Sequence, residues 1–140
     1  MLTLQVVTDP VAKARARVTF AGGKPRSFTP RKTEEAEWRI RQQFMTEHPG
    51  FEPLIGAIVL SVVAYVAMPV SMPKKRRAGA RPVTRPDIDN YAKTVLDALN
   101  GVAFKDDSQV VSLVMEKRYA VGYPPRWEIV IDCLQEVAPS

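Results

Sequence analysis

The sequence predicts an α/β (α+β) fold: a single small domain over residues 1–140, with a mixed β-sheet of about four to five strands packed against two helices. Three observations support this prediction. Short runs of alternating or β-branched apolar residues are typical of strands, and two longer segments place apolar residues at helical spacing. The chain also has 140 residues, of which 46% are hydrophobic, as expected for one globular core.

The predicted elements are distributed along the whole chain. In order, they are a strand at 2–7, a short strand at 17–20, a helix at 34–44, a strand at 55–68, a helix at 88–100, and strands at 109–119 and 126–134. The first strand has apolar residues at every second position, beginning at Leu2. Residues 8–32 are rich in Pro, Gly and basic residues and therefore predict mostly loop. Thr33 would cap the first helix, in which Trp38 and Phe44 would face the core.

The second half of the chain carries clearer signals. Because β-branched residues dominate 55–68, this segment favours a long buried strand over a helix. Prolines and a glycine make 71–86 a loop, and the helix at 88–100 is amphipathic and stops at Gly101. The last two strands alternate apolar and polar residues. A short flexible tail is expected after residue 135.

Basic residues are concentrated in two regions of this chain, whose net charge is +5. The predicted loop holds six of them and no acidic residue: Lys74, Lys75, Arg76, Arg77, Arg81 and Arg85. A looser cluster near the amino end comprises Lys13, Arg15, Arg17, Lys24, Arg26, Arg31 and Lys32. Either could be a solvated surface, but the density of charge in the loop favours contacts to nucleic-acid phosphates.

Other classes of protein and ligand find little support. Cys133 is the only cysteine, so an intrachain disulfide is excluded. The longest apolar run, at 54–70, is interrupted and shorter than the roughly 20 residues of a membrane helix. With no signal-peptide pattern, a cytoplasmic location without membrane association is expected. No phosphate-binding glycine motif is present, so no nucleotide cofactor is expected.

Four carboxylates bracket the second helix and form the most informative pattern. Asp87 and Asp89 stand at its start, and Asp106 and Asp107 follow its end. Singly, each is explained by a helix cap or a polar turn. A helix of this length spans roughly 20 Å, however, and the chain from Gly101 to Asp107 covers about the same distance if it doubles back extended. Asp87, Asp89 and Asp107 could therefore share one Mg²⁺ site, with Asp106 beside it, and Mn²⁺ could substitute.

Lys93 lies one helical turn after Asp89 and has two interpretations. It could form i, i+4 ion pairs with Asp89 and Asp97, worth only tenths of a kcal/mol. Alternatively, its ammonium group could stabilise charge on a phosphate undergoing cleavage. The spacing alone does not decide between them.

The order of these residues resembles the signature of the RusA-type Holliday junction resolvases. Residues 85–101 followed by 106–111 match the family pattern D-x-D-N-x-x-K, then D-A-L, then D-D-x-Q-V. The resemblance is strongest over residues 69–117. It implies a small α/β homodimer that binds branched DNA, in particular four-way junctions, and cuts symmetrically related strands with Mg²⁺. A role in recombination and repair is implied, and a prophage origin is compatible with it.

The resemblance also implies roles for individual residues. Asp87, Asp89 and Asp107 match the family's essential carboxylates, Lys93 matches its essential lysine, and Asp106 matches a neighbouring acid of no definite role. Two rival hypotheses come from other classes of protein. One is a non-catalytic nucleic-acid-binding module whose acids cap a helix, and the other is a structural or protein-interaction role.

Overall fold

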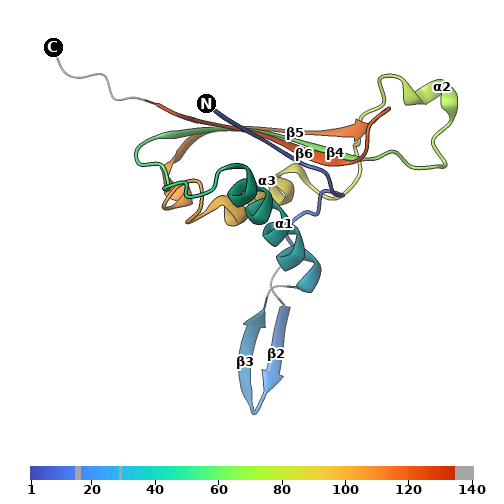
Figure 1. Cartoon of the computed structure of the whole chain (residues 1–140). Helices are drawn as coiled ribbons and strands as arrows, with labels where there is room; N and C mark the ends of the chain where they lie inside the picture. The colour runs from blue at the N-terminus through green and yellow to red at the C-terminus, as the bar shows by residue number, and fades with distance from the viewer. Residues whose placement is uncertain (15–16, 29, 135–140) are drawn as a thin grey trace.

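The fold is a mixed four-stranded sheet with two helices on one of its faces, as a computed structural model shows for residues 1–14, 17–28 and 30–134 (Figure 1). In chain order the elements are β1 (Leu2–Val6), β2 (Arg17–Ala21), β3 (Lys24–Phe28), α1 (Arg31–Glu47), β4 (Ile58–Ala67), α2 (Lys74–Arg77), α3 (Ile88–Leu99), the 3-10 turn η1 (Asp107–Gln109), β5 (Val110–Ala120) and β6 (Arg126–Cys133). The predicted fold class is thus confirmed. Arg15 and the predicted flexible tail after 135 lie outside the described residues.

The sheet has the strand order β1-β6-β4-β5, which leaves β1 and β5 at its edges. β6 is antiparallel to both of its neighbours, whereas β4 and β5 are parallel. Parallel neighbours need a crossover connection, and α3 lies in the connection between β4 and β5. This crossover positions the part of the chain that carries the predicted site.

The core lies between the sheet and helices α1 and α3. Every second residue of β4 from Ile58 to Ala64 is buried, as expected for a strand with one covered face. The large, fully buried side chains come from the sheet, from both helices and from the turn after α3, and include Ile40, Phe44, Leu60, Val95, Leu99, Phe104 and Trp127. The helices therefore hold their positions on the sheet mainly through apolar burial.

Helix α1 differs from its prediction at its start and in the face that it buries. It begins at Arg31, directly after Pro30, and no side chain caps it. Thr33 is instead buried, and its Oγ1 accepts a hydrogen bond from the Ala14 backbone N at 3.4 Å. The expectation that Trp38 faces the core is wrong, since its exposed fraction is 59%. Trp38 lies two positions after buried Ala36, a rotation of about 200° around the helix.

The predicted loop at 71–86 contains one turn of helix, α2, that the sequence analysis did not predict. Lys and Arg are good helix formers, and Pro73 stands directly before the turn. Arg77 closes the turn, because its Nε donates a hydrogen bond to the Met72 carbonyl oxygen at 3.1 Å. The rest of the segment has no regular structure, in agreement with the prediction.

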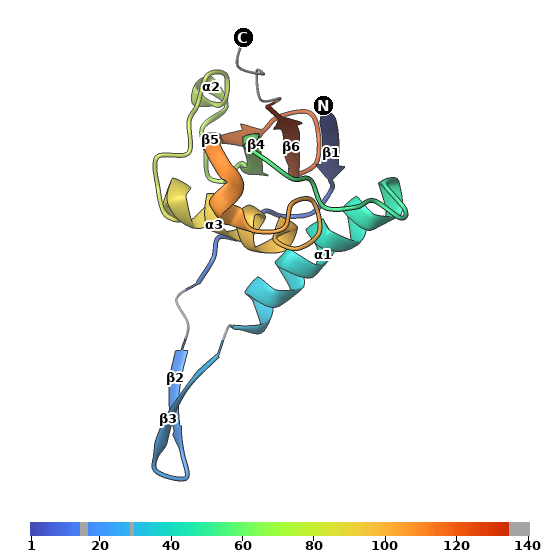
Figure 2. The ribbon, with the colours of Figure 1, turned by 90° about the vertical axis from the view of Figure 1, so that its left-hand side faces the viewer.

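Strands β2 and β3 form a separate two-stranded sheet that projects from the body of the molecule (Figures 1 and 2). The prediction included β2 but not β3. In the part of the chain that is described, no helix is long and apolar enough to cross a membrane.

Candidate active site

The start of α3 carries two of the predicted carboxylates. Asp87 occupies the N-cap position and Asp89 the first turn, and both residues are exposed. The Asp87 side chain makes no capping hydrogen bond. Helix capping, the structural interpretation of this residue, is therefore unsupported, and its carboxylate is available to a ligand.

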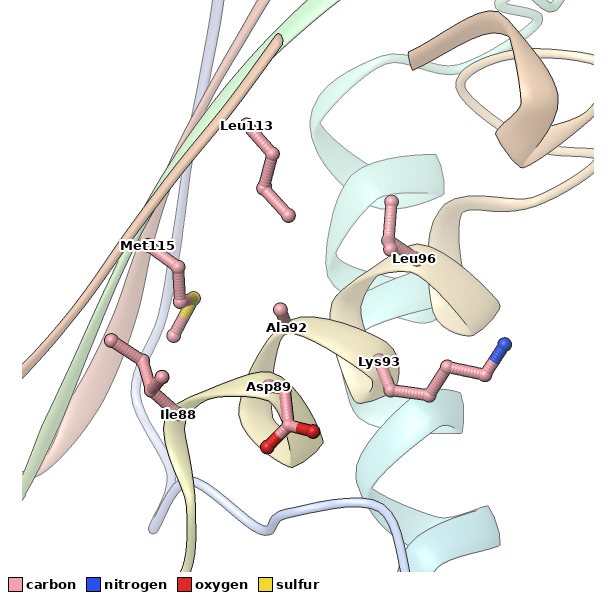
Figure 3. A pocket seen from close by; sticks show the side chains of 7 residues that line it. All are labelled: Ile88, Asp89, Ala92, Lys93, Leu96, Leu113 and Met115. Carbon is pink, nitrogen blue, oxygen red and sulfur yellow. The ribbon is translucent and has the colours of Figure 1, made fainter. Parts of the chain in front are cut away.

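Lys93 follows one turn later on α3 and pairs with Asp97, its Nζ 3.7 Å from Oδ1. The Lys93 side chain is 54% exposed, and such a pair is worth only about 0.3–0.5 kcal/mol. In Figure 3 its ammonium group points away from the carboxylate of Asp89. Because the pair is weak, the long side chain can leave Asp97 for an incoming phosphate at little cost.

Asp97 also belongs to a tighter group of charges with Lys13. The Lys13 Nζ lies 2.6 Å from Glu37 Oε1 and 3.1 Å from Asp97 Oδ2. Burial alone would lower the pKa of Lys13, but the hydrogen bonds and negative charges of Glu37 and Asp97 raise it above 10.5. The sequence grouped Lys13 with a surface cluster of cations. The structure instead makes it a link between α1, α3 and the segment before β2.

The second acidic pair lies just before β5. Asp106 caps η1: its Oδ2 accepts a hydrogen bond from the Ser108 N at 3.2 Å, and its own N donates to Gln109 Oε1 at 3.0 Å. This hydrogen bond from Ser108 lowers the pKa of Asp106. Asp106 is thus a structural residue of the turn. Asp107 is half-exposed in the first turn of η1.

The structure does not bring Asp107 to the start of α3. Strand β5 runs antiparallel to α3, since Leu113 lies beside Leu96 and Met115 beside Ile88 (Figure 3). Asp107, which precedes β5, is therefore at the carboxyl end of the helix. Because α3 has 12 residues, the two sets of acids are separated by roughly 15–20 Å.

The chain after Gly101 was expected to run back extended along α3, and a tight turn prevents this. Directly after α3 the chain turns tightly, with the Gly101 N donating to the Phe104 carbonyl oxygen at 2.8 Å, and Gly101 has a φ of 79°. Residues 101–104 form this turn, so too few residues remain before Asp107 for the chain to run back along the helix. Across the described residues, no three His, Cys, Asp or Glu side chains gather closely enough to hold a metal ion.

Lys117 is a residue of this region that sequence reasoning missed. From β5, its Nζ donates hydrogen bonds to the backbone oxygens of Thr84 at 2.8 Å and Pro86 at 3.0 Å. It thereby fixes the end of the basic loop, immediately before Asp87, to the edge strand. Its place in a strand gave no sequence signal for this contact.

A groove of about 470 Å³ lies between α3 and β5 (Figure 3). Its lining is mostly apolar: Ile88, Ala92, Leu96, Leu113 and Met115, with Asp89 and Lys93 at its edge. The carboxylate and the ammonium group point away from the apolar floor. The groove suits an apolar partner, and its rim suits a charged one.

The donor set at the start of α3 fits a hard cation. Asp87 and Asp89 offer only oxygen ligands and are exposed. Mg²⁺ commonly takes one or two carboxylates and completes its shell with water and substrate phosphate. One chain therefore supplies two of the three expected carboxylates.

The basic loop leads directly into this site. It leaves the end of β4 and returns to the start of α3 (Figure 1). Of its six cationic residues, Arg77 alone is half-buried. The other five are exposed, namely Lys74, Lys75, Arg76, Arg81 and Arg85. The last of these cations, Arg85, stands two positions before Asp87 in the chain.

Comparisons with known proteins identify the family of the chain. The model of the family described as endodeoxyribonuclease RusA matches residues 8–132. The chain is also similar to the uncharacterized protein YqaN of Bacillus subtilis (strain 168), with 37% identity over 133 residues that cover 90% of this chain and 92% of the relative. The family match spans the hairpin, the basic loop, both acidic pairs and most of the main sheet. The chain therefore belongs to the RusA family of endodeoxyribonucleases.

Proposed function

We propose that this protein is a Mg²⁺-dependent endonuclease that resolves four-way DNA junctions by paired hydrolysis of phosphodiester bonds. The observation that carries the proposal is the pair of exposed carboxylates, Asp87 and Asp89, at the start of α3 beside the basic loop. Anionic DNA is not attracted by carboxylates alone. A cation bound by both the carboxylates and a phosphate would remove the repulsion between these negative groups.

The side chains at this site would have different roles in hydrolysis. Asp87 and Asp89 would hold the metal, which when bound activates water and stabilises the charge that develops on the phosphate. Lys93, released from its weak pair with Asp97, would place an ammonium group on the phosphate or on the leaving oxygen. The exposed cations of the loop would bind neighbouring phosphates and so orient the strand.

A homodimer would complete the site. Within one chain Asp107 lies at the wrong end of α3, whereas a twofold axis through the groove between α3 and β5 would reverse the direction of the partner's β5. The Asp107 end of one copy would then face the Asp87 end of the other.

The surface around the groove supports this packing. Val111, Leu113 and Val114 on the edge strand β5 are 63%, 40% and 53% exposed, and Leu113 lines the groove. Exposed apolar residues that gather on an edge strand are typical of an interface. Two sites related by twofold symmetry would also cut the two symmetry-related strands of a junction.

Replacing Asp89 tests the assignment directly. Asp89→Asn should lower cleavage of a labelled four-way junction in Mg²⁺ by about 100-fold or more, because it removes a charged ligand while keeping the shape of the side chain. Junction binding, measured without metal, should be retained or strengthened. Asp132→Asn, a change to an exposed carboxylate on β6, is the matched control and should cleave normally.

Two results would contradict the proposal. Undiminished cleavage by Asp89→Asn would exclude the site. Tight, salt-dependent binding by the wild-type protein with no metal-dependent incision would favour the non-catalytic binding module instead.

A further inference from the structure

The β2–β3 hairpin is the part of the molecule that the proposed active site leaves unexplained. Its strands pair from Arg17 with Phe28 to Ala21 with Lys24, and Gly22 and Gly23 form the turn with φ values of 64° and 78°. Two successive positive φ values are characteristic of the type I′ turn that suits a twisted hairpin. The sequence therefore specifies a projecting arm, which Figures 1 and 2 show from two sides.

The arm exposes apolar side chains. Phe20 and Val18, two residues apart on β2 and hence on one face, are 78% and 58% exposed. Among the described residues, the two strands of the hairpin pack mainly against each other. An isolated two-stranded hairpin is marginally stable in water, so a surface of this kind is expected to meet a partner.

Charge identifies the class of the partner. Between Asp9 and Glu34 the sequence contains seven basic residues and no acidic one. A second copy of the same arm would be repelled, whereas a polyanion would be attracted. An exposed phenyl ring in a segment whose charged residues are all basic matches the way proteins bind unpaired nucleic acid, with bases stacked on aromatic rings and phosphates neutralised nearby.

The root of the arm is fixed beside the candidate active site. Thr94 Oγ1 donates a hydrogen bond to the Val11 carbonyl oxygen at 2.8 Å, and the Lys13 N donates to the Asn90 carbonyl oxygen at 2.8 Å. Both contacts lie on the helix that bears Asp89. A hollow of about 460 Å³, lined in part by Lys32, Pro86 and Tyr91, lies between this root and the start of α3.

We propose that the β2–β3 hairpin is a DNA-binding arm, with Phe20 stacking on a base exposed at the branch point while the cations of the arm bind the adjoining phosphates. This inference rests on the proposed function, because it takes branched DNA as the ligand. It adds a second contact to that of the basic loop. The loop would hold the strand that is cut, and the arm would recognise the branch.

Binding measured in EDTA tests the arm without requiring cleavage. Phe20→Ala should weaken binding to a four-way junction by about 5- to 100-fold, in line with the loss of one stacked base, and should leave binding to matched duplex nearly unchanged. Phe20→Trp should retain junction binding, because it keeps an aromatic face. Trp38→Ala, which removes an exposed aromatic residue from α1, is the matched control and should bind like the wild-type protein.

A fluorescent base analogue at the branch point gives a second measurement. 2-Aminopurine at that position should change its fluorescence on binding the wild-type protein but not the Phe20→Ala variant.

Equal junction affinity of Phe20→Ala and the wild-type protein would overturn the proposal that the hairpin binds DNA. So would a change of oligomeric state in Phe20→Ala, seen by light scattering, because the ring would then contact a second copy. Normal cleavage by the wild-type protein in either case would leave the proposed nuclease standing, whereas absence of wild-type cleavage would overturn the nuclease alone.

Discussion

The charge of Lys13 stabilises the fold rather than binding a ligand. Its ammonium group connects Glu37 on α1 with Asp97 on α3, and all three side chains are largely buried, with exposed fractions of 21%, 17% and 23%. Lys13→Met would leave two carboxylates close together without their cation. We expect a loss of about 2 kcal/mol in the free energy of unfolding at neutral pH, measured by urea denaturation.

The pH dependence of this effect has a definite sign. The pKa of Lys13 is raised in the folded state, so its contribution is fully present below 10.5 and is lost as the pH rises through the folded-state value. The difference in stability between the wild-type protein and Lys13→Met should therefore be constant near neutrality and shrink at strongly alkaline pH. Lys105→Met removes an exposed lysine and should show neither effect. Equal stability of Lys13→Met and the wild-type protein would contradict the role of this link.

The basic loop is expected to bind DNA phosphates without contributing to the stability of the fold. Lys75 and Arg76 lie exposed on α2, so replacing both with Gln should leave thermal stability unchanged. Binding should weaken to the same degree for every DNA sequence, and the slope of log K against log salt should fall by about 0.9 for each duplex phosphate that the variant no longer neutralises. The double change Arg39→Gln and Lys105→Gln removes the same charge from other exposed positions. An equal fall in slope for that control would mean that net charge, rather than the loop, binds DNA.

The elements themselves were largely predictable from the sequence. Alternation in β4 and β6 and the amphipathic pattern of α3 report directly on which face is buried, because one face of each element packs on the core. The prediction for Trp38 was wrong because it relied on the size of the aromatic side chain, which suggested a core position. The buried stripe of α1 includes smaller residues instead, among them Thr33 and Ala36.

The candidate site was predictable only in part. The motif identified Asp87, Asp89 and Lys93 because they lie within two turns of one helix, where spacing fixes geometry. Asp107 could not be placed in the same way, since its position depends on the turn after Gly101 and on the direction of β5. The contact of Lys117 with the loop before Asp87 joins segments about 30 residues apart, which no local pattern reveals.

The separation of Asp107 from Asp87 and Asp89 bears on how two copies of the protein assemble. If two copies complete each other's sites, the Asp89→Asn and Asp107→Asn variants should each be inactive alone. A mixed dimer of the two would still contain one intact site, formed by Asp87 and Asp89 of the Asp107→Asn copy and Asp107 of the Asp89→Asn copy. Its second site would carry both changes.

Co-expression of the two variants with different tags, followed by tandem purification, isolates that mixed dimer. We expect it to recover Mg²⁺-dependent cleavage, to nick a four-way junction on one strand and to release few paired-cut products, because only one of its sites is intact. A site contained within each chain predicts the opposite, since every copy in the mixed dimer would then carry a damaged site and no cleavage would return. Light scattering of the wild-type protein provides the accompanying measurement, and a monomer at the concentrations that support cleavage would exclude a shared site.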